Sequence, residues 1–497
     1  MGILAKQTVR NTLLAYAGLC LGFLNVAILY PRILAEDEFG LTRLLVSLAT
    51  IAGAFAQLGL DNAIVRYFPY FRDPSRRNNG LLTLVCAVAL AGAFVAMLLL
   101  GALHPFFTAV FSDKNGLYGS YGLHALPLVL AEVFFLVLRG YSRSIHRTVQ
   151  PTFLREFLLR VLQTILIASQ AVWHFPFGVF MLLFTGTFML CTIGLVIDMW
   201  RQGERLVAWS KVRAPSRLRR SMVRFSAYTL VASMASIILG SLDQLMIGAL
   251  LGGEALALVG YYAVAFNFAS VVSAPMRALG QLGIPLLADA WKRNDVVTIQ
   301  RLYSVTVSTQ FTVGGFLFLL VWVSLGDLFT YLPPAFSVAL APALIISLAG
   351  LLNMSVGLSS GIITMSRSFW FDSATSLLLI SLNAILNWIF ILQMGIVGAA
   401  WSTLASLTIV SVMRVWFLWR RFNLWPYSWR TLCIPLLIIV MGLAMNYLRL
   451  TGIAWIDIVL RSILAAIVYW PIAKWLKLAP ELAEYVTTLR KSLSSAH

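Results

Sequence analysis

Charged side chains recur inside segments of the chain that are otherwise apolar. They include Arg43, Asp61, Arg66, Asp243 and Arg277. A guanidinium pairs with phosphate through two parallel hydrogen bonds, whereas a carboxylate inside a membrane can hold a cation or a coupling proton. These residue types therefore favour anion binding and ion coupling. Each could equally hold two helices together through a polar partner.

The polar residues form two matched stripes, about 220 residues apart. The first holds Arg43, Ser47, Thr50, Ala54, Gln57 and Asp61, and the second holds Asn267, Ser270, Ala274, Arg277 and Gln281. Spacings of three and four residues keep each stripe on one helical face. Polar side chains that face lipid are costly. We therefore expect the stripes to face each other or a water-filled central cavity.

An internal repeat relates the two stripes. At the same shift Gly40 meets Gly260, and at a slightly smaller one Asn25 meets Asp243. The repeated segments are separated by an even number of apolar segments, so they have the same orientation. This predicts a parallel repeat about an axis along the membrane normal, as transporters have. The first, second, seventh and eighth segments would then line the cavity.

The elements that must position these residues are about fourteen apolar segments, each of roughly the 20 residues that a helix needs to cross a bilayer. We place them at 11–31, 41–66, 80–103, 118–139, 151–172, 176–199, 222–248, 255–286, 302–325, 336–362, 370–392, 395–418, 430–448 and 453–473. The chain is therefore predicted to be an all-α integral membrane protein. It would have two pseudo-symmetric six-helix bundles and two C-terminal helices.

These segments divide the chain into an N-lobe (1–199), a basic cytoplasmic linker (200–221), a C-lobe (222–418) and a last part (419–497) with two helices and a tail. The net charge of +18 suits such a protein, because Lys and Arg collect in cytoplasmic loops. Their distribution places both termini in the cytoplasm. We expect a multi-pass protein of a bacterial inner membrane, with no nucleic-acid partner.

Other kinds of site have little support in the sequence. The residues show no metal-ligand spacing, no phosphate-cradling Gly-Lys-Ser/Thr loop and no pairing of a nucleophile with a base. We therefore expect no metal, no cofactor and no enzymatic activity. Glu132 is a weaker candidate for ion coupling. Arg155, Glu156 and Arg160 are expected to form local pairs near one end of the fifth segment.

Three passages resemble bacterial polysaccharide exporters. They are LGLDNAIVRYF at 58–68, DQLMIG at 243–248 followed by GYY at 260–262, and NAILN at 383–387 followed by GIVGAAWST at 395–403. Their order and spacing are similar to those of the polysaccharide transporter family. That family belongs to the multidrug/oligosaccharidyl-lipid/polysaccharide (MOP) exporter superfamily and includes Wzx-type O-antigen flippases. The resemblance covers nearly the whole chain.

The resemblance implies a flippase that carries undecaprenyl-pyrophosphate-linked oligosaccharide, a repeat unit of O-antigen (lipopolysaccharide) or exopolysaccharide, to the periplasmic leaflet by alternating access. The predicted cavity ligands are Arg43, Gln57, Arg66, Asn267, Ser270, Arg277 and Gln281. Asn25, Asp61 and Asp243 are candidates for H⁺ or Na⁺ coupling or for helix pairing. The lipid bilayer is a partner, and a polysaccharide polymerase and other assembly proteins are further candidates.

Three alternatives remain open. A multidrug/cation antiporter of the same superfamily would favour buried carboxylates over arginines. A peptidoglycan-precursor (lipid II) flippase would be essential to the cell. A membrane polysaccharide polymerase or ligase usually needs a large outer loop, and the longest outer loop predicted here, at about 104–117, is short.

Overall fold

The computed structural model describes residues 2–73, 78–111, 115–145, 147–207, 215–447, 451–476 and 478. These residues form helices joined by short turns and contain no β-strand. Thirteen of their helical spans are long and apolar enough to cross a membrane. They correspond to thirteen of the predicted segments. The fourteenth, 222–248, lies in a helix at Ser216–Leu250, some of whose side chains are outside the described set. The predicted all-α membrane fold is confirmed.

The α-helices follow one another along the chain with few long connections. Their bounds are α1 Gly2–Phe23, α2 Tyr30–Ile33, α3 Glu36–Ala56, α4 Leu60–Phe71, α5 Leu81–Ala102, α6 His104–Val110, α7 Leu117–Tyr121, α8 Ala125–Ser144, α9 Val149–Thr152, α10 Leu159–Trp173, α11 Phe177–Arg201, α12 Ser216–Leu250, α13 Ala255–Lys292, α14 Val296–Phe329, α15 Leu340–Met354, α16 Ser359–Met365, α17 Phe369–Met394, α18 Ile396–Phe422, α19 Trp429–Tyr447 and α20 Ala454–Trp475. Two π-helical segments, η1 (Leu24–Leu29) and η5 (Phe153–Leu158), interrupt the first and fifth spans.

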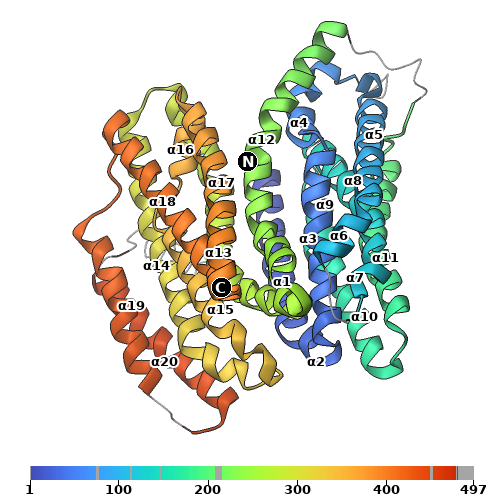
Figure 1. Ribbon diagram of the computed structural model, residues 1–497. Helices are drawn as coiled ribbons and strands as arrows, with labels where there is room; N and C mark the ends of the chain where they lie inside the picture. The colour runs from blue at the N-terminus through green and yellow to red at the C-terminus, as the bar shows by residue number, and fades with distance from the viewer. Residues whose placement is uncertain are drawn as a thin grey trace, which may run out of the picture. The chain divides into compact units, whose positions relative to one another are not determined.

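The described chain divides into two compact units, residues 1–263 and 264–497. In the first unit, α8 packs against α3, α4, α5 and α11, and α12 lies along both α3 and α4 (Figure 1). The start of α13 belongs to the same unit. This unit therefore holds the predicted first, second and seventh segments and the beginning of the eighth. The lobe boundaries expected from the sequence stay a prediction.

The second unit is built around α14, which packs against α15, α19 and α20 (Figure 1). One buried guanidinium ties α20 to α14: Arg461 lies 3.1 Å from the Asp327 carboxylate and 3.4 Å from that of Asp457. The Tyr469 hydroxyl also donates to the Thr312 carbonyl at 2.8 Å. These contacts attach the last helix to the body of the unit, because buried polar groups are costly unless paired.

Two predicted spans are not continuous helices. The second, expected at 41–66, breaks between α3 and α4, where Leu58 and Gly59 have φ of 53° and 71°. The tenth, expected at 336–362, breaks between α15 and α16, where Gly357 has φ of 54°. Residues other than glycine rarely adopt this left-handed backbone conformation. A residue that does adopt it usually ends a helix. Apolar composition alone gave no sign of either break.

Candidate functional site

The crossing of α3 and the start of α13 is made by the two glycines that the repeat relates. A Cβ added at Gly40 would lie 1.6 Å from the Leu256 carbonyl oxygen, so backbone meets backbone there. A Cβ at Gly260 would lie 2.9 Å from the Phe39 ring and 3.4 Å from the Glu36 carbonyl oxygen. Gly40 thus faces Leu256, four positions before Gly260, and Gly260 lies near Glu36, four positions before Gly40. This reciprocal contact is what a two-fold related pair of helices produces.

Buried polar contacts continue from this crossing along α12. The Ser47 hydroxyl of α3 donates to the Gln244 side chain of α12 at 2.6 Å. The Tyr262 hydroxyl of α13 donates to the Asp243 carboxylate at 2.6 Å, and Asp243 is only 1% exposed. These bonds join the second, seventh and eighth segments, and the central cavity predicted between them stays a prediction. A carboxylate in this position can hold a proton or join helices, and the geometry allows both.

The break between α3 and α4 lies inside the second span and is closely packed. Gly59 abuts α12, and a Cβ on it would lie 2.4 Å from the Ser226 carbonyl oxygen. Gln57 is fully buried: its side-chain oxygen accepts from the Asp61 N–H at 3.4 Å, and its amide nitrogen has no partner. Broken helices at membrane depth often mark transporter binding sites, because they free backbone and side-chain polar groups.

Asp61 and Arg66 follow the break on α4 but lie in different surroundings. The buried Asp61 carboxylate accepts from the Asn62 N–H at 2.8 Å, and an acidic group is favourable at a helix start. Arg66 is exposed and lies 4.2 Å from the Phe225 ring of α12. The neighbouring Tyr67 hydroxyl contacts the Ser221 hydroxyl at 2.8 Å. Asp61 is therefore buried and bonded within the first turn of its own helix, whereas Arg66 is exposed, and the predicted roles of both residues stay predictions.

Arg43 points into the interior of the first unit. Its guanidinium carbon lies 4.9 Å from the Tyr30 ring centre, 5.4 Å from that of Phe39 and 6.0 Å from that of Phe184. The three rings come from α2, α3 and α11. The sequence predicts a cavity ligand at this position, and that role stays a prediction. The aromatic surroundings are a feature that sequence reasoning missed.

Asn25 lies in η1 and joins the first and fifth spans. Its amide nitrogen donates to the Arg160 carbonyl at 2.9 Å, and its oxygen accepts from the Thr164 hydroxyl at 2.8 Å. Both groups have partners, as helix pairing requires. The role of Asn25 in ion coupling stays a prediction.

The charges of the fifth span pair in two ways. Arg160 pairs locally with Glu156 at 2.9 Å, as expected. Arg155 instead reaches across to Glu132 of α8 at 2.5 Å, between the rings of Phe135 and Phe188. The expectation of a purely local role for Arg155 is therefore wrong. A sequence offers no periodic signal for a pair between helices that are distant along the chain.

The other predicted ligands come from the second unit. Asn267 and Ser270 lie on α13, where the Ser270 hydroxyl donates to the Asn267 carbonyl at 2.7 Å. Their side chains are partly buried. The side chains of Arg277 and Gln281 lie outside the described part of the chain. The cavity roles of these four residues stay predictions.

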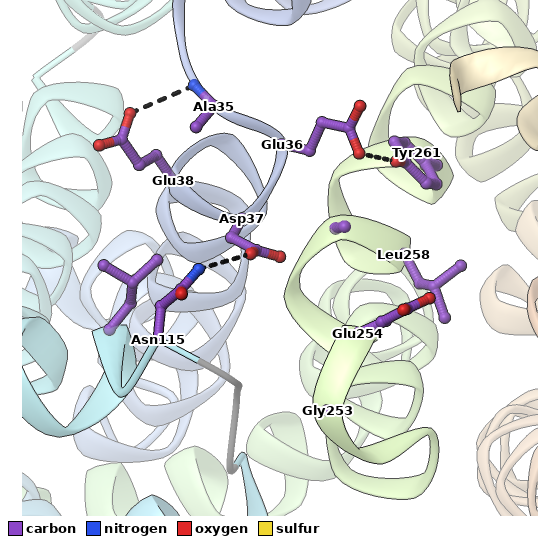
Figure 2. A pocket seen from close by; sticks show the side chains of 11 residues that line it. Ala35, Glu36, Asp37, Glu38, Asn115, Gly253, Glu254, Leu258 and Tyr261 are labelled. Atoms are coloured by element: carbon purple, nitrogen blue, oxygen red, sulfur yellow. Dashed lines mark hydrogen bonds between the residues drawn. The ribbon is translucent and has the colours of Figure 1, made fainter. Parts of the chain in front are cut away.

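A cavity of about 540 Å³ opens beside the crossing of α3 and α13 within the first unit. Figure 2 shows three successive carboxylates at the start of α3 with separate partners. Asp37 accepts from the Asn115 side chain at 3.0 Å, Glu38 from the Ala35 N–H at 3.2 Å, and Glu36 from the Tyr261 hydroxyl. Glu254 lines the same cavity. Sequence reasoning missed this cavity, although the acidic run at 36–38 could have drawn attention to it.

Among the described residues, no group of three or more His, Cys, Asp or Glu side chains has the arrangement of a metal site. The polar groups of the first unit are carboxylates, amides, hydroxyls and guanidiniums, and several of them are bonded across helices. Such a set can bind oligosaccharide hydroxyls or phosphate and can exchange protons.

Comparison with known proteins identifies the family of the chain. Residues 4–291, more than half of the chain, match the family described as polysaccharide biosynthesis protein. An uncharacterized membrane protein of Methanocaldococcus jannaschii is 21% identical over 421 residues, which cover 79% of this chain and 80% of that protein.

Two solved structures show the same fold. One, described as the lipid II flippase MurJ in an inward closed conformation, is 11% identical with a TM-score of 0.69, covering 93% of this chain and 98% of that chain. The other, an inward-facing multidrug resistance MATE transporter, is 14% identical with a TM-score of 0.57, covering 84% and 94%. The chain therefore belongs to the polysaccharide biosynthesis protein family and has the fold of the MOP exporter superfamily.

Proposed function

We propose that this protein is a flippase for undecaprenyl-pyrophosphate-linked oligosaccharide, the repeat unit of an O-antigen or exopolysaccharide. The family match over residues 4–291 is the observation that carries the proposal. The similarity in fold to MurJ supports a flipping mechanism, because that protein is described as a lipid II flippase. Movement would run from the cytoplasmic to the periplasmic leaflet by alternating access. No covalent step on the substrate is part of the proposal.

Substrate recognition follows from the chemistry of the cargo. A pyrophosphate needs cationic hydrogen-bond donors, and guanidiniums bind it bidentately. We assign this role to Arg277 and to the exposed Arg66. The amide and hydroxyl groups of Gln57, Asn267, Ser270 and Gln281 suit the sugars. The apolar lipid chain would remain in the bilayer, where it needs no polar partner.

Ion coupling is assigned to Asp243. This carboxylate is 1% exposed and has the Tyr262 hydroxyl 2.6 Å away. Its protonation would change the hydrogen bond that joins α12 to α13. A coupling H⁺ or Na⁺ taken up there would act on the seventh and eighth spans, the first two helices of the second half of the repeat. The protein would lie in a bacterial inner membrane with both termini cytoplasmic, as the distribution of Lys and Arg indicates.

A test in cells replaces Arg277 by Ala in a strain whose surface polysaccharide depends on this protein. We expect at least a tenfold loss of surface polysaccharide at normal expression, because one charged hydrogen-bonding group contributes about 1.5–3 kcal/mol. Lys292→Ala, at the exposed end of the same helix, is the matched control and should change little. Unchanged polysaccharide in the Arg277→Ala strain would remove this arginine from the mechanism.

Depletion of the protein separates the remaining candidates. Loss of surface polysaccharide with normal growth supports the proposed function. Lysis on depletion would point to lipid II as the cargo, which is the substrate named for the similar MurJ structure. Sensitivity to cationic drugs with intact polysaccharide would point to the multidrug/cation antiporter alternative, in line with the multidrug resistance named for the MATE structure.

A further inference from the structure

Arg43 is enclosed by aromatic rings rather than by carboxylates. The rings of Tyr30, Phe39 and Phe184 lie 4.9–6.0 Å from its guanidinium carbon. Rings stabilise a cation through their faces. They leave the N–H groups at the edge of the guanidinium without acceptors. The N–H groups of this buried guanidinium therefore still need hydrogen-bond acceptors that lie in the plane of the group.

Few acceptors are present. The Arg43 Nε donates to the Thr42 hydroxyl in a long bond of 3.4 Å. The Nη2 atom is buried and has no hydrogen-bond partner. Tyr30 is fully buried, and its hydroxyl interacts with the Arg43 guanidinium through charge and through a side-chain hydrogen bond. Apart from this mutual contact, the Arg43 Nη2 and the Tyr30 O–H have no acceptor among the described residues.

The other enclosed guanidiniums of the described chain have anionic partners. Arg155 pairs with Glu132, Arg414 with Asp372 at 3.1 Å, and Arg461 with Asp327. Arg139 interacts with the charges of Asp61 and Glu132. In this part of the chain, Tyr30 is the one titratable group found to act on Arg43, and no carboxylate lies within ion-pair distance of it.

We propose that Arg43 and Tyr30 bind a small inorganic anion, chloride or phosphate, inside the first unit. The anion would accept hydrogen bonds from Nη2 and from the phenol while the rings cover the guanidinium faces. It would neutralise a charge that is costly inside a membrane protein when unpaired. The site is separate from the proposed recognition of lipid pyrophosphate, and its occupancy can be measured without transport.

The test measures thermal unfolding of the purified protein in chloride-free sodium gluconate, with sodium chloride or sodium phosphate replacing gluconate at constant ionic strength. We expect the wild type to gain about 5 °C, with a gain that rises with the logarithm of the anion concentration, because a ligand that binds only the folded state stabilises it by mass action. Arg43→Met should abolish this gain, and Tyr30→Phe should weaken it. Arg420→Met, which removes an exposed guanidinium that has no assigned binding role, should respond as the wild type does.

The two salts distinguish a site for halide from a site for phosphate. A gain with chloride alone identifies a halide site, and a gain with phosphate identifies an oxyanion site. The proposal is overturned if neither salt stabilises the wild type, or if Arg43→Met keeps the wild-type response. If Arg43→Met fails to fold, crystals of the wild type grown in bromide or in phosphate test the site instead. An anomalous bromide peak, or phosphate density, in contact with the Arg43 guanidinium supports the proposal. The absence of anion density at this position in both crystals contradicts it.

Discussion

Replacing Gly40 by Ala is expected to lower the unfolding temperature of the purified protein by about 5 °C, equivalent to about 3 kcal/mol. The added methyl carbon would lie 1.6 Å from the Leu256 carbonyl oxygen, and that backbone can move away only by displacing the start of α13. The loss of stability should lie at the upper end of the range for overpacking substitutions, because the group in the way is backbone and not a flexible side chain that could move aside.

Two further glycines make this prediction specific. Gly260→Ala should cost less, about 1 kcal/mol, because its nearest neighbour at 2.9 Å is the edge of the Phe39 ring. Gly186→Ala, in α11, meets nothing within 4 Å and should be neutral or slightly stabilising. Thermal unfolding followed by size-exclusion chromatography would rank the three variants. Equal stability of Gly40→Ala and Gly186→Ala would contradict the close crossing of α3 and α13.

Replacing Asp243 by Asn is expected to remove the dependence of transport on an ion gradient. The substitution preserves the shape of the side chain but removes the charge that accepts from the Tyr262 hydroxyl at 2.6 Å. A charged hydrogen bond is worth about 1.5–3 kcal/mol, so gradient-driven transport should fall at least about tenfold. Movement down a substrate gradient, with no ion gradient imposed, should continue.

Tyr262→Phe is the matched variant, because it removes the hydroxyl and keeps both the ring and the carboxylate. It should shift the pH at which transport responds to the gradient without abolishing the response. If Asp243 serves only to join helices, Asp243→Asn should instead lower the unfolding temperature and reduce driven and downhill transport equally. Measuring both transport modes and the unfolding temperature of each variant separates coupling from helix pairing.

Much of the fold could be predicted because membrane spans depend on composition. A run of about 20 apolar residues has few alternatives to a spanning helix. The repeat also related Gly40 to Gly260, although their contact in space was not predicted. The break at Leu58 could not be predicted, since a leucine in the left-handed region has no sequence signal. Only the neighbouring Gly59 hinted at it.

Side-chain direction was the least predictable feature. A stripe of polar residues fixes one helical face, but not what that face meets. Ser47 bonds to Gln244 of α12, which belongs to neither stripe, whereas Arg43, one turn away, meets rings from α2 and α11. Likewise Arg155 pairs with Glu132 on another helix rather than with a residue of its own turn. Such contacts depend on how distant helices pack, which periodicity does not encode.

The most direct test of the proposed function is flipping by the purified protein in liposomes. A fluorescent undecaprenyl-pyrophosphate-linked oligosaccharide would be placed in both leaflets, and a membrane-impermeant reagent would modify the outer pool. The account predicts that the inner pool becomes accessible far faster than in protein-free liposomes, and faster still under an ion gradient. Accessibility equal to that of protein-free liposomes, or movement of lipid II without movement of the oligosaccharide lipid, would contradict it.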